Sequence, residues 1–237
     1  IVGPEQAGYF RVVFKALDQI DAVFENKEKH LSYGFVQLKQ GKMSSRMGNV
    51  VSGEWLLDEA KLRIRKEFKK MDEETSEKVA VGSVKYSMLK FARESNIQFS
   101  FEDSISLEGN SGPYLQYAYA RTQSVVRKSE ILNSKFETNS NDQNTKLKNY
   151  KFEPEEVLLL RSLNRFQEVV MESAETFAPN LLCNYLFDLS QKFNLFYQKH
   201  KILESENREL RLALTMAVGQ VIKNGLYLLG ISASERM

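Results

Sequence analysis

The sequence contains very little cysteine. Cys183 is the single cysteine among 237 residues, so the chain cannot form an internal disulfide framework or a multi-cysteine zinc site. Such usage suits a reducing compartment, and we expect the cytoplasm or an organelle matrix. Cys183 lies in an apolar helical pattern, which favours a buried and inert thiol over a nucleophile.

Net charge and long apolar runs are also lacking. The 33 lysines and arginines nearly balance 31 acidic residues, for a net charge of +2, so any surface for nucleic acid must be local. There is no apolar run long enough to cross a bilayer and no signal peptide, so we expect no membrane partner. The chain begins with Ile1 rather than methionine, and we expect a piece of a longer protein.

The remaining composition is that of a globular protein. Hydrophobic residues make up 42% and charged residues 27% of the chain, as in ordinary soluble domains. A chain of 237 residues can form one large domain or two modest domains with real cores.

The segment of residues 40–51 carries the densest chemistry. Gly41 and Gly48 bracket it and predict a loop. Between the glycines lie two cations and two hydroxyls, from Lys42, Ser44, Ser45 and Arg46. With free backbone N–H groups they suit a pyrophosphate or triphosphate, and such a loop can stabilise charge that moves onto phosphates in a transition state. The P-loop pattern is absent, and a basic surface turn is the plain alternative.

Residues 109–121 read Gly-Asn-Ser-Gly-Pro-Tyr-Leu-Gln-Tyr-Ala-Tyr-Ala-Arg. Pro113 suits the first turn of a helix. Tyr114, Tyr117 and Arg121 then fall on one helical face. Periodicity alone predicts a packing stripe that ends in an arginine.

Apolar spacing predicts the remaining elements. In the first half we expect a strand end in residues 1–8, then a helix whose apolar face joins the core (Phe10, Val13, Phe14, Leu17), and then a buried strand in 31–38. Two helices should follow, one over 54–70 that is capped by Ser52 and one over 76–93, with acidic residues between them. An extended connector should cover residues 99–103. From Pro113 onward we expect an all-helical bundle. Its helices start at Pro113, Pro154 (stripe Val157, Leu160, Leu163, Phe166, Val170), Pro179 (buried Leu182, Leu186, Leu189, Phe193, Phe196) and Glu209, and residues 134–149 form a flexible loop.

Lys42-Met43-Ser44-Ser45 resembles the Lys-Met-Ser-Lys signature of class I aminoacyl-tRNA synthetases, with Ser45-Arg46 in place of the last lysine. The longer loop resembles the arginyl-tRNA synthetase version. Four further strings resemble the same family in the same order: residues 109–121, 193–197, 210–231 and the terminal Ser-Glu-Arg-Met, where the family usually has Pro-Glu-Arg-Met. The resemblance covers essentially the whole chain.

The resemblance implies a mainly α fold. Residues 1–110 would be the C-terminal part of a Rossmann-like α/β catalytic domain, and residues 111–237 an all-helical DALR-type anticodon-binding domain. Such enzymes join arginine to tRNA(Arg) using ATP, with Mg2+ on the phosphates, through an arginyl-adenylate. The His-x-Gly-His motif and the arginine pocket of the family would lie upstream. We therefore expect an inactive fragment of a monomeric ligase, with no metal site in this chain.

The same resemblance implies roles for single residues. Lys42 and Arg46 would act in catalysis on the ATP phosphates. ATP contacts would come from Gly3, Gln6, Lys42, Met43, Ser44 and Ser45, although Tyr9 stands near the position of a family histidine. Contacts to tRNA would come from Tyr114, Gln116, Tyr117, Arg121, Asn194, Tyr197, Lys199, Arg236 and Met237.

Two other classes of function stay open at this stage. One is a non-catalytic tRNA-binding protein that retains the helical domain, although such a protein would not need the signature loop. The other is a helical interaction scaffold. An upstream His-x-Gly-His motif would favour the ligase, and its absence the binding protein.

Overall fold

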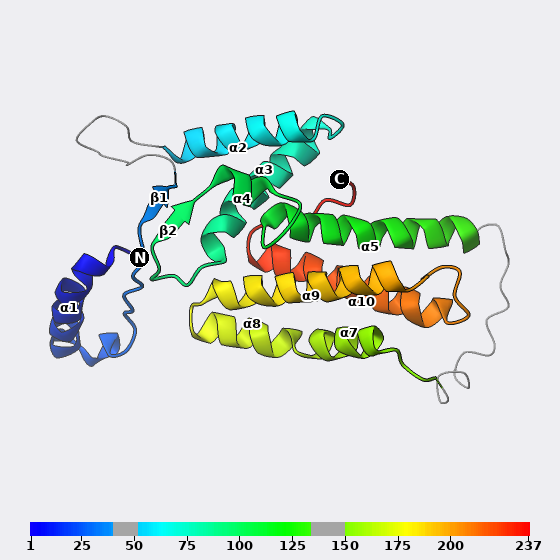
Figure 1. Cartoon of the computed structure of the whole chain (residues 1–237). Helices are drawn as coiled ribbons and strands as arrows, with labels where there is room; N and C mark the ends of the chain where they lie inside the picture. The colour runs from blue at the N-terminus through cyan, green and yellow to red at the C-terminus, as the bar shows by residue number, and fades with distance from the viewer. Residues whose placement is uncertain (40–51, 134–149) are drawn as a thin grey trace.

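The computed structural model describes residues 1–39, 52–133 and 150–237. The loop that carries the signature and residues 134–149 lie outside these ranges. The described chain is mainly helical with one small parallel sheet, as expected. Figure 1 shows two parts: the described residues up to 105 hold the sheet and several helices, and the described residues from 112 onward form a bundle of long helices.

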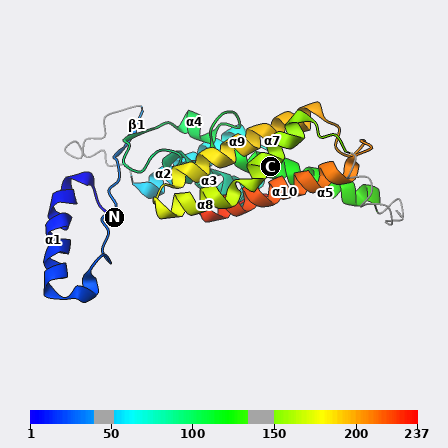
Figure 2. The same ribbon diagram turned by 90° about the horizontal axis from the view of Figure 1, so that it is seen from below.

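The first helix, α1 (Ala7–Ile20), follows the short 3-10 helix η1 (Pro4–Gln6) and precedes a second one, η2 (Ala22–Phe24). The expectation that its apolar face joins the core is wrong, because no residue of α1 is buried. Both views show α1 standing apart from the other helices (Figures 1 and 2). An amphipathic pattern fixes which face is apolar, but it does not supply the partner that covers it.

The sheet pairs β1 (Val36–Leu38) with β2 (Ile97–Phe99) in parallel. Farther back along the chain, Ser32 forms a parallel bridge with Val2. The strand expected over residues 31–38 is therefore shorter, and it is not buried, since Tyr33 and Phe35 are exposed. Gly34 explains the close approach of the two segments: a Cβ there would lie 2.1 Å from the Ser95 carbonyl oxygen.

Helices α2 (Gly53–Glu67) and α3 (Glu73–Leu89) pack on this sheet through a hydrophobic cluster that is separate from the core of the bundle. We call it the second core cluster; its buried members are Leu56, Ala60, Ile64, Val79, Ala80, Val84, Phe99 and Phe101. The predicted cap of α2 is confirmed, since Ser52 Oγ accepts from the Trp55 amide at 3.1 Å. Helix α3 begins earlier than predicted, because Asp72 caps it by accepting from the Thr75 amide at 2.9 Å. The acidic residues expected to separate the helices thus form the first turn of α3, where they stabilise the positive end of the helix.

The expected extended connector over residues 99–103 is instead the end of β2 followed by α4 (Phe101–Ile105). Ser100 starts this short helix, because its hydroxyl accepts from the Asp103 amide at 3.2 Å. Phe99 and Phe101 remain buried in an edge-to-face pair with ring centroids 5.1 Å apart. One serine cap therefore turns an apolar strand into a helix without exposing its rings.

Helix α5 (Gly112–Asn133) connects the two parts. It crosses α3 where a Cβ on Gly112 would lie only 2.6 Å from the Gly82 carbonyl oxygen. The close crossing places α5 between α3 on one side and helices α9 and α10 of the bundle on the other.

The bundle comprises α5, α7 (Pro154–Asn164), α8 (Phe166–Glu175), α9 (Pro179–Lys199) and α10 (Arg208–Leu228). The five residues predicted to be buried in α9 are all in the core. The stripe predicted through residues 157–170 is partly wrong: α7 ends at Asn164, and Leu159 rather than Leu160 is buried. Cys183 is buried as expected, and burial raises the pKa of its thiol to about 12.

Candidate nucleic-acid interface

The signature loop leaves the sheet at the carboxyl end of β1. Leu38 ends the strand and α2 begins at Gly53, so Lys42, Met43, Ser44, Ser45 and Arg46 lie outside the described residues. In open sheets of parallel strands, ligands bind beyond the carboxyl ends. The loop therefore starts from a position that suits a nucleotide site.

The base of this loop already has its charges paired. Arg63 donates to Glu59 at 2.6 Å and to Glu102 at 3.1 Å, and its guanidinium lies 4.4 Å from the centroid of the Phe101 ring. Lys39 pairs with Asp103 at 3.6 Å. Hydrogen bonds to the Glu102 carboxylate, first from its own backbone amide and then from Ser100, lower its pKa. Within the described residues, these two cations are therefore matched by acids rather than presented to a phosphate.

Gly3 and Gln6 lie in the turn that follows the Val2 bridge. Gly3 is buried and its carbonyl accepts from the Gln6 amide at 3.2 Å, whereas the Gln6 side chain is exposed. Val2 bridges to Ser32, on the extended segment that leads into β1 and the loop. The structure thus brings the Gly3 turn close to the segment that leads into β1, whereas Tyr9 is an exposed residue of α1.

Five of the residues predicted to contact tRNA form one cluster between α5 and α9. The guanidinium of Arg121 donates to Asn194 Oδ1 at 2.6 Å and to the Tyr117 hydroxyl at 3.1 Å. Asn194 in turn donates to the Tyr114 hydroxyl at 2.8 Å. We call these residues, with Tyr197, the Arg121 cluster.

The Arg121 cluster presents aromatic surface to solvent. The guanidinium carbon lies 4.7 Å from the centroid of Tyr117 and 5.0 Å from that of Tyr197. Tyr197 keeps 37% of its surface exposed. A guanidinium beside two aromatic rings stabilises both ring orientations. The arrangement offers a fixed ring, partly in water, next to polar groups.

A groove of about 530 Å³ lies beside Tyr197 at the end of α9. Its rim carries Lys199, which donates to Glu155 at 2.6 Å while 55% of its side chain stays exposed. Lys199 first, and then His200, hold the pKa of Glu155 down at about 2. The groove is lined by Val125, Lys128, Tyr197, Gln198, Lys199, His200, Lys201, Ile202, Leu203 and Glu204. It combines cations, an aromatic ring and apolar walls.

Three residues predicted to contact tRNA lie elsewhere. Gln116 is fully buried, and its amide donates to the carbonyls of Lys78 at 3.2 Å and Ser232 at 2.8 Å. A residue without solvent access cannot touch RNA in this structure, so Gln116 leaves the candidate interface. Met237 packs against the second core cluster, and Arg236 is exposed beside it. The chain end is therefore apart from the Arg121 cluster.

The sequence did not single out Lys128 and His200, which line the groove, or Glu155, which contacts Lys199 and His200. Glu155 lies in the first turn of α7. Its pairing with Lys199 joins residues 44 positions apart, which a local pattern does not reveal.

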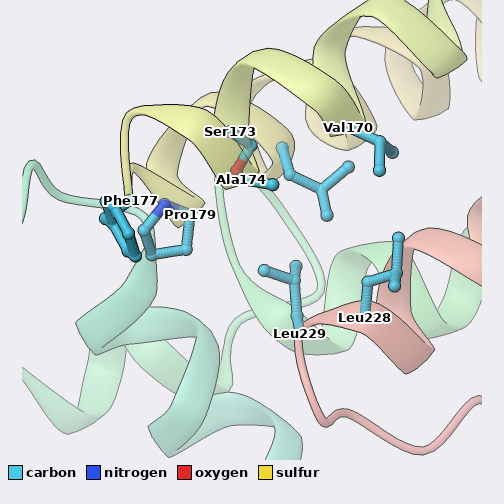
Figure 3. A pocket seen from close by; sticks show the side chains of 8 residues that line it. Val170, Ser173, Ala174, Phe177, Pro179, Leu228 and Leu229 are labelled. Atoms are coloured by element: carbon cyan, nitrogen blue, oxygen red, sulfur yellow. The ribbon is translucent and has the colours of Figure 1, made fainter. Parts of the chain in front are cut away.

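A second pocket, of about 390 Å³, lies where α8 turns into α9 (Figure 3). Phe177 and Pro179 border it at the turn, and Leu228 and Leu229 face it from the end of α10. Val170, Ser173, Ala174 and Leu182 complete the lining. The lining contains no charged side chain, so this pocket does not suit a phosphate.

Comparison with known proteins divides the chain into two domains, as the fold does. Residues 1–101 match the catalytic domain of class I tRNA synthetases (R), and residues 115–237 match the DALR anticodon binding domain. The chain is 35% identical to the arginine-tRNA ligase of Parabacteroides distasonis and 37% identical to that of Streptococcus suis, over its full length in both cases. The chain belongs to the arginyl-tRNA synthetase family.

Solved arginyl-tRNA synthetases have the same fold. The structure from Thermus thermophilus matches with a TM-score of 0.84 and 31% identity over 100% of this chain and 40% of that chain. The Plasmodium falciparum structure shares the fold with a TM-score of 0.75 at 23% identity. The chain covers 41% and 42% of the two curated relatives. The expected family and fold class are confirmed, whereas the boundary at residue 110 stays a prediction.

None of the helices in the described part of the chain has the length and apolarity needed to span a bilayer.

Proposed function

We propose that this chain carries the distal part of the nucleotide site and the anticodon-binding bundle of an arginine-tRNA ligase. The substrates of the whole enzyme would be arginine, ATP and tRNA(Arg). The observation that carries the proposal is the Arg121 cluster beside the groove at the end of α9. It supports recognition of an unpaired RNA loop by residues that sequence comparison alone cannot bring together.

The chemistry of the cluster suits a single-stranded loop. Unpaired bases are read by stacking on aromatic rings and by hydrogen bonds to their exposed edges. Tyr197 offers an exposed ring held by Arg121. Lys128, Lys199 and Lys201 on the groove can meet backbone phosphates, which explains how a chain of net charge +2 can bind RNA locally.

For the nucleotide half, we propose that Lys42 and Arg46 hold the phosphates of ATP, with Ser44, Ser45 and the Met43 backbone around them. Gly3 and Gln6 would contact the nucleotide from the neighbouring turn. Among the described residues there is no group of three or more His, Cys, Asp or Glu side chains that could hold a metal ion. We propose that Mg2+ would enter on the phosphates of ATP and neutralise part of their charge.

Titration with tRNA tests the proposal. We expect the full-length protein to bind tRNA(Arg) at one fixed salt concentration, and Tyr197→Ala to weaken binding by about 1–3 kcal/mol, the range for one base-aromatic stack. Tyr227→Ala is the matched control, because Tyr227 is 80% exposed and lies at the C-terminal end of α10, whereas the groove lies before the N-terminal end of that helix. Absence of tRNA(Arg) binding, or an equal loss in both variants, would contradict the proposal.

Pyrophosphate exchange tests the ligase part. Because the chain covers about two fifths of its curated relatives, we expect no arginine-dependent exchange of pyrophosphate into ATP by the chain alone, with tRNA present. The full-length protein should catalyse it. A full-length protein that binds tRNA(Arg) but never exchanges pyrophosphate would be a non-catalytic tRNA-binding protein.

A further inference from the structure

We propose that Glu155 is a positioning residue of the tRNA interface, whose carboxylate fixes Lys199 and His200 on the rim of the groove beside Tyr197. This inference rests on the proposed function. It assigns a role to an acidic residue at a surface that would meet a polyanion.

The geometry shows one carboxylate serving two groove residues. Glu155 Oε1 accepts from Lys199 Nζ at 2.6 Å, and Oε2 lies 3.1 Å from His200 Nε2. Only 11% of the Glu155 side chain is exposed. The ring of His200 also packs against Phe196, with centroids 5.3 Å apart. The end of α9 is therefore held from the first turn of α7.

The neighbouring residue fixes the next stretch of backbone. Glu156 closes a capping box at the start of α7 and accepts from Arg211 Nε at 2.8 Å. The same guanidinium donates to the Lys201 carbonyl at 3.0 Å. Glu156 thus secures the backbone after His200, while Glu155 secures the side chains that line the groove.

The pair leaves Lys199 able to bind RNA. A lysine ammonium has three donors, and Glu155 uses one of them. Holding the side chain in advance reduces the rotamer freedom that must be lost when RNA binds. Lys201 and Glu204 differ, because their 2.7 Å pair is 78% and 73% exposed and is weakly restrained.

The sign of the effect separates positioning from simple charge. Removing a carboxylate beside an RNA site should strengthen RNA binding if only charge matters, because repulsion of phosphates is lost. If Glu155 positions Lys199 and His200, its removal should weaken binding instead. Glu204 lines the groove, and Glu155 contacts two of its lining residues. Glu155→Gln and Glu204→Gln each remove one negative charge there, so they form a matched pair.

The experiment is titration of the full-length protein with tRNA(Arg) at fixed salt, with melting measured in parallel. We expect Glu155→Gln to weaken binding about tenfold, or about 1.4 kcal/mol, and Glu204→Gln to bind slightly more tightly than wild type. Glu155→Asp keeps the charge at the helix start but withdraws the carboxylate. Glu155→Asp should also weaken binding, and it replaces Glu155→Gln in the test if that variant does not fold.

A double-mutant cycle separates positioning from general destabilisation. If Glu155 acts through Lys199, Glu155→Gln should have a smaller effect in a Lys199→Gln background. An equal effect there, or unchanged or tighter binding by Glu155→Gln and Glu155→Asp, would overturn the inference. If Tyr197→Ala still weakened binding, the proposed function would stand. A wild-type protein that binds no tRNA(Arg) would overturn both.

Discussion

The guanidinium of Arg121 connects α5 to α9, so Arg121→Ala is the most informative single change in the candidate interface. The substitution removes two hydrogen bonds, to Asn194 and Tyr117, and the cation beside the Tyr117 and Tyr197 rings. It leaves no unpaired charge behind, because both hydrogen-bond partners, the Asn194 amide and the Tyr117 hydroxyl, are neutral. Its effects should therefore reach both fold stability and RNA binding.

The magnitude follows from these contacts. A hydrogen bond to a charged group contributes about 1.5–3 kcal/mol, and an exposed cation–π contact about 0.5–1 kcal/mol. The cluster is only partly buried, so water replaces a share of each contact and the sum overestimates the effect. We expect a loss of about 2 kcal/mol, which lowers the melting temperature by about 4–8 °C for a domain of this size. Arg121→Lys should lose less, since it keeps the charge but not the planar fork.

The assay is melting together with tRNA titration for Arg121→Ala, Tyr197→Ala and the double variant. Because Arg121 holds the Tyr197 ring, the two effects on RNA binding should be non-additive, with a coupling of about 1 kcal/mol. Additive effects, or an Arg121→Ala variant that melts and binds as wild type does, would refute the view that the guanidinium organises the cluster.

Three other changes test separate features. Phe193→Ala removes a ring with no exposed surface, so it should lower stability by about 3–5 kcal/mol in melting experiments, with less effect on tRNA affinity than Tyr197→Ala. Since the pKa of Glu155 falls from 4.5 to about 2 on folding, chiefly through Lys199, its stabilising effect is present above pH 4.5 and is lost as pH falls toward 2. Glu155→Gln should flatten that part of a curve of melting temperature against pH. In the full-length enzyme, Lys42→Ala should lower kcat and kcat/KM for arginine activation together, by about 2.7–4 kcal/mol in steady-state kinetics, whereas an unchanged kcat would leave the loop a surface turn.

Local signals in the sequence predicted the elements that depend on local physics. Ser52 starts α2 through its hydroxyl, and Pro179 starts α9. The buried face of α9 follows from helical periodicity, because this face carries more apolar residues than any other face of the helix. The shared face of Tyr114, Tyr117 and Arg121 also came from spacing alone, and the structure brings it against Asn194.

Features that depend on distant partners were not predicted. The apolar face of α1 was assigned to the core, yet nothing in residues 7–20 is buried. Leu160 was predicted to be buried in a stripe that runs on to Val170, whereas Leu159 is the buried residue and the helix is interrupted at Arg165, between α7 and α8. The role of Glu155 needed Lys199 and His200, which lie 44 and 45 residues away.

Helix α5 shows why the residues predicted to bind tRNA lie in two places, some near the chain end and the others in the Arg121 cluster. Gln116 and Arg127 contact the chain end, through Ser232 and Glu235, while Arg121 contacts α9. Gln116 and Arg127 are about three helical turns apart and so share one face, which differs from that of Arg121. The chain end is thereby held on the side of α3, where Met237 joins the second core cluster. We therefore expect a change at Met237 to affect the proposed RNA interface through packing around α3 and α5, whereas a change at Tyr197 would act directly at that proposed interface.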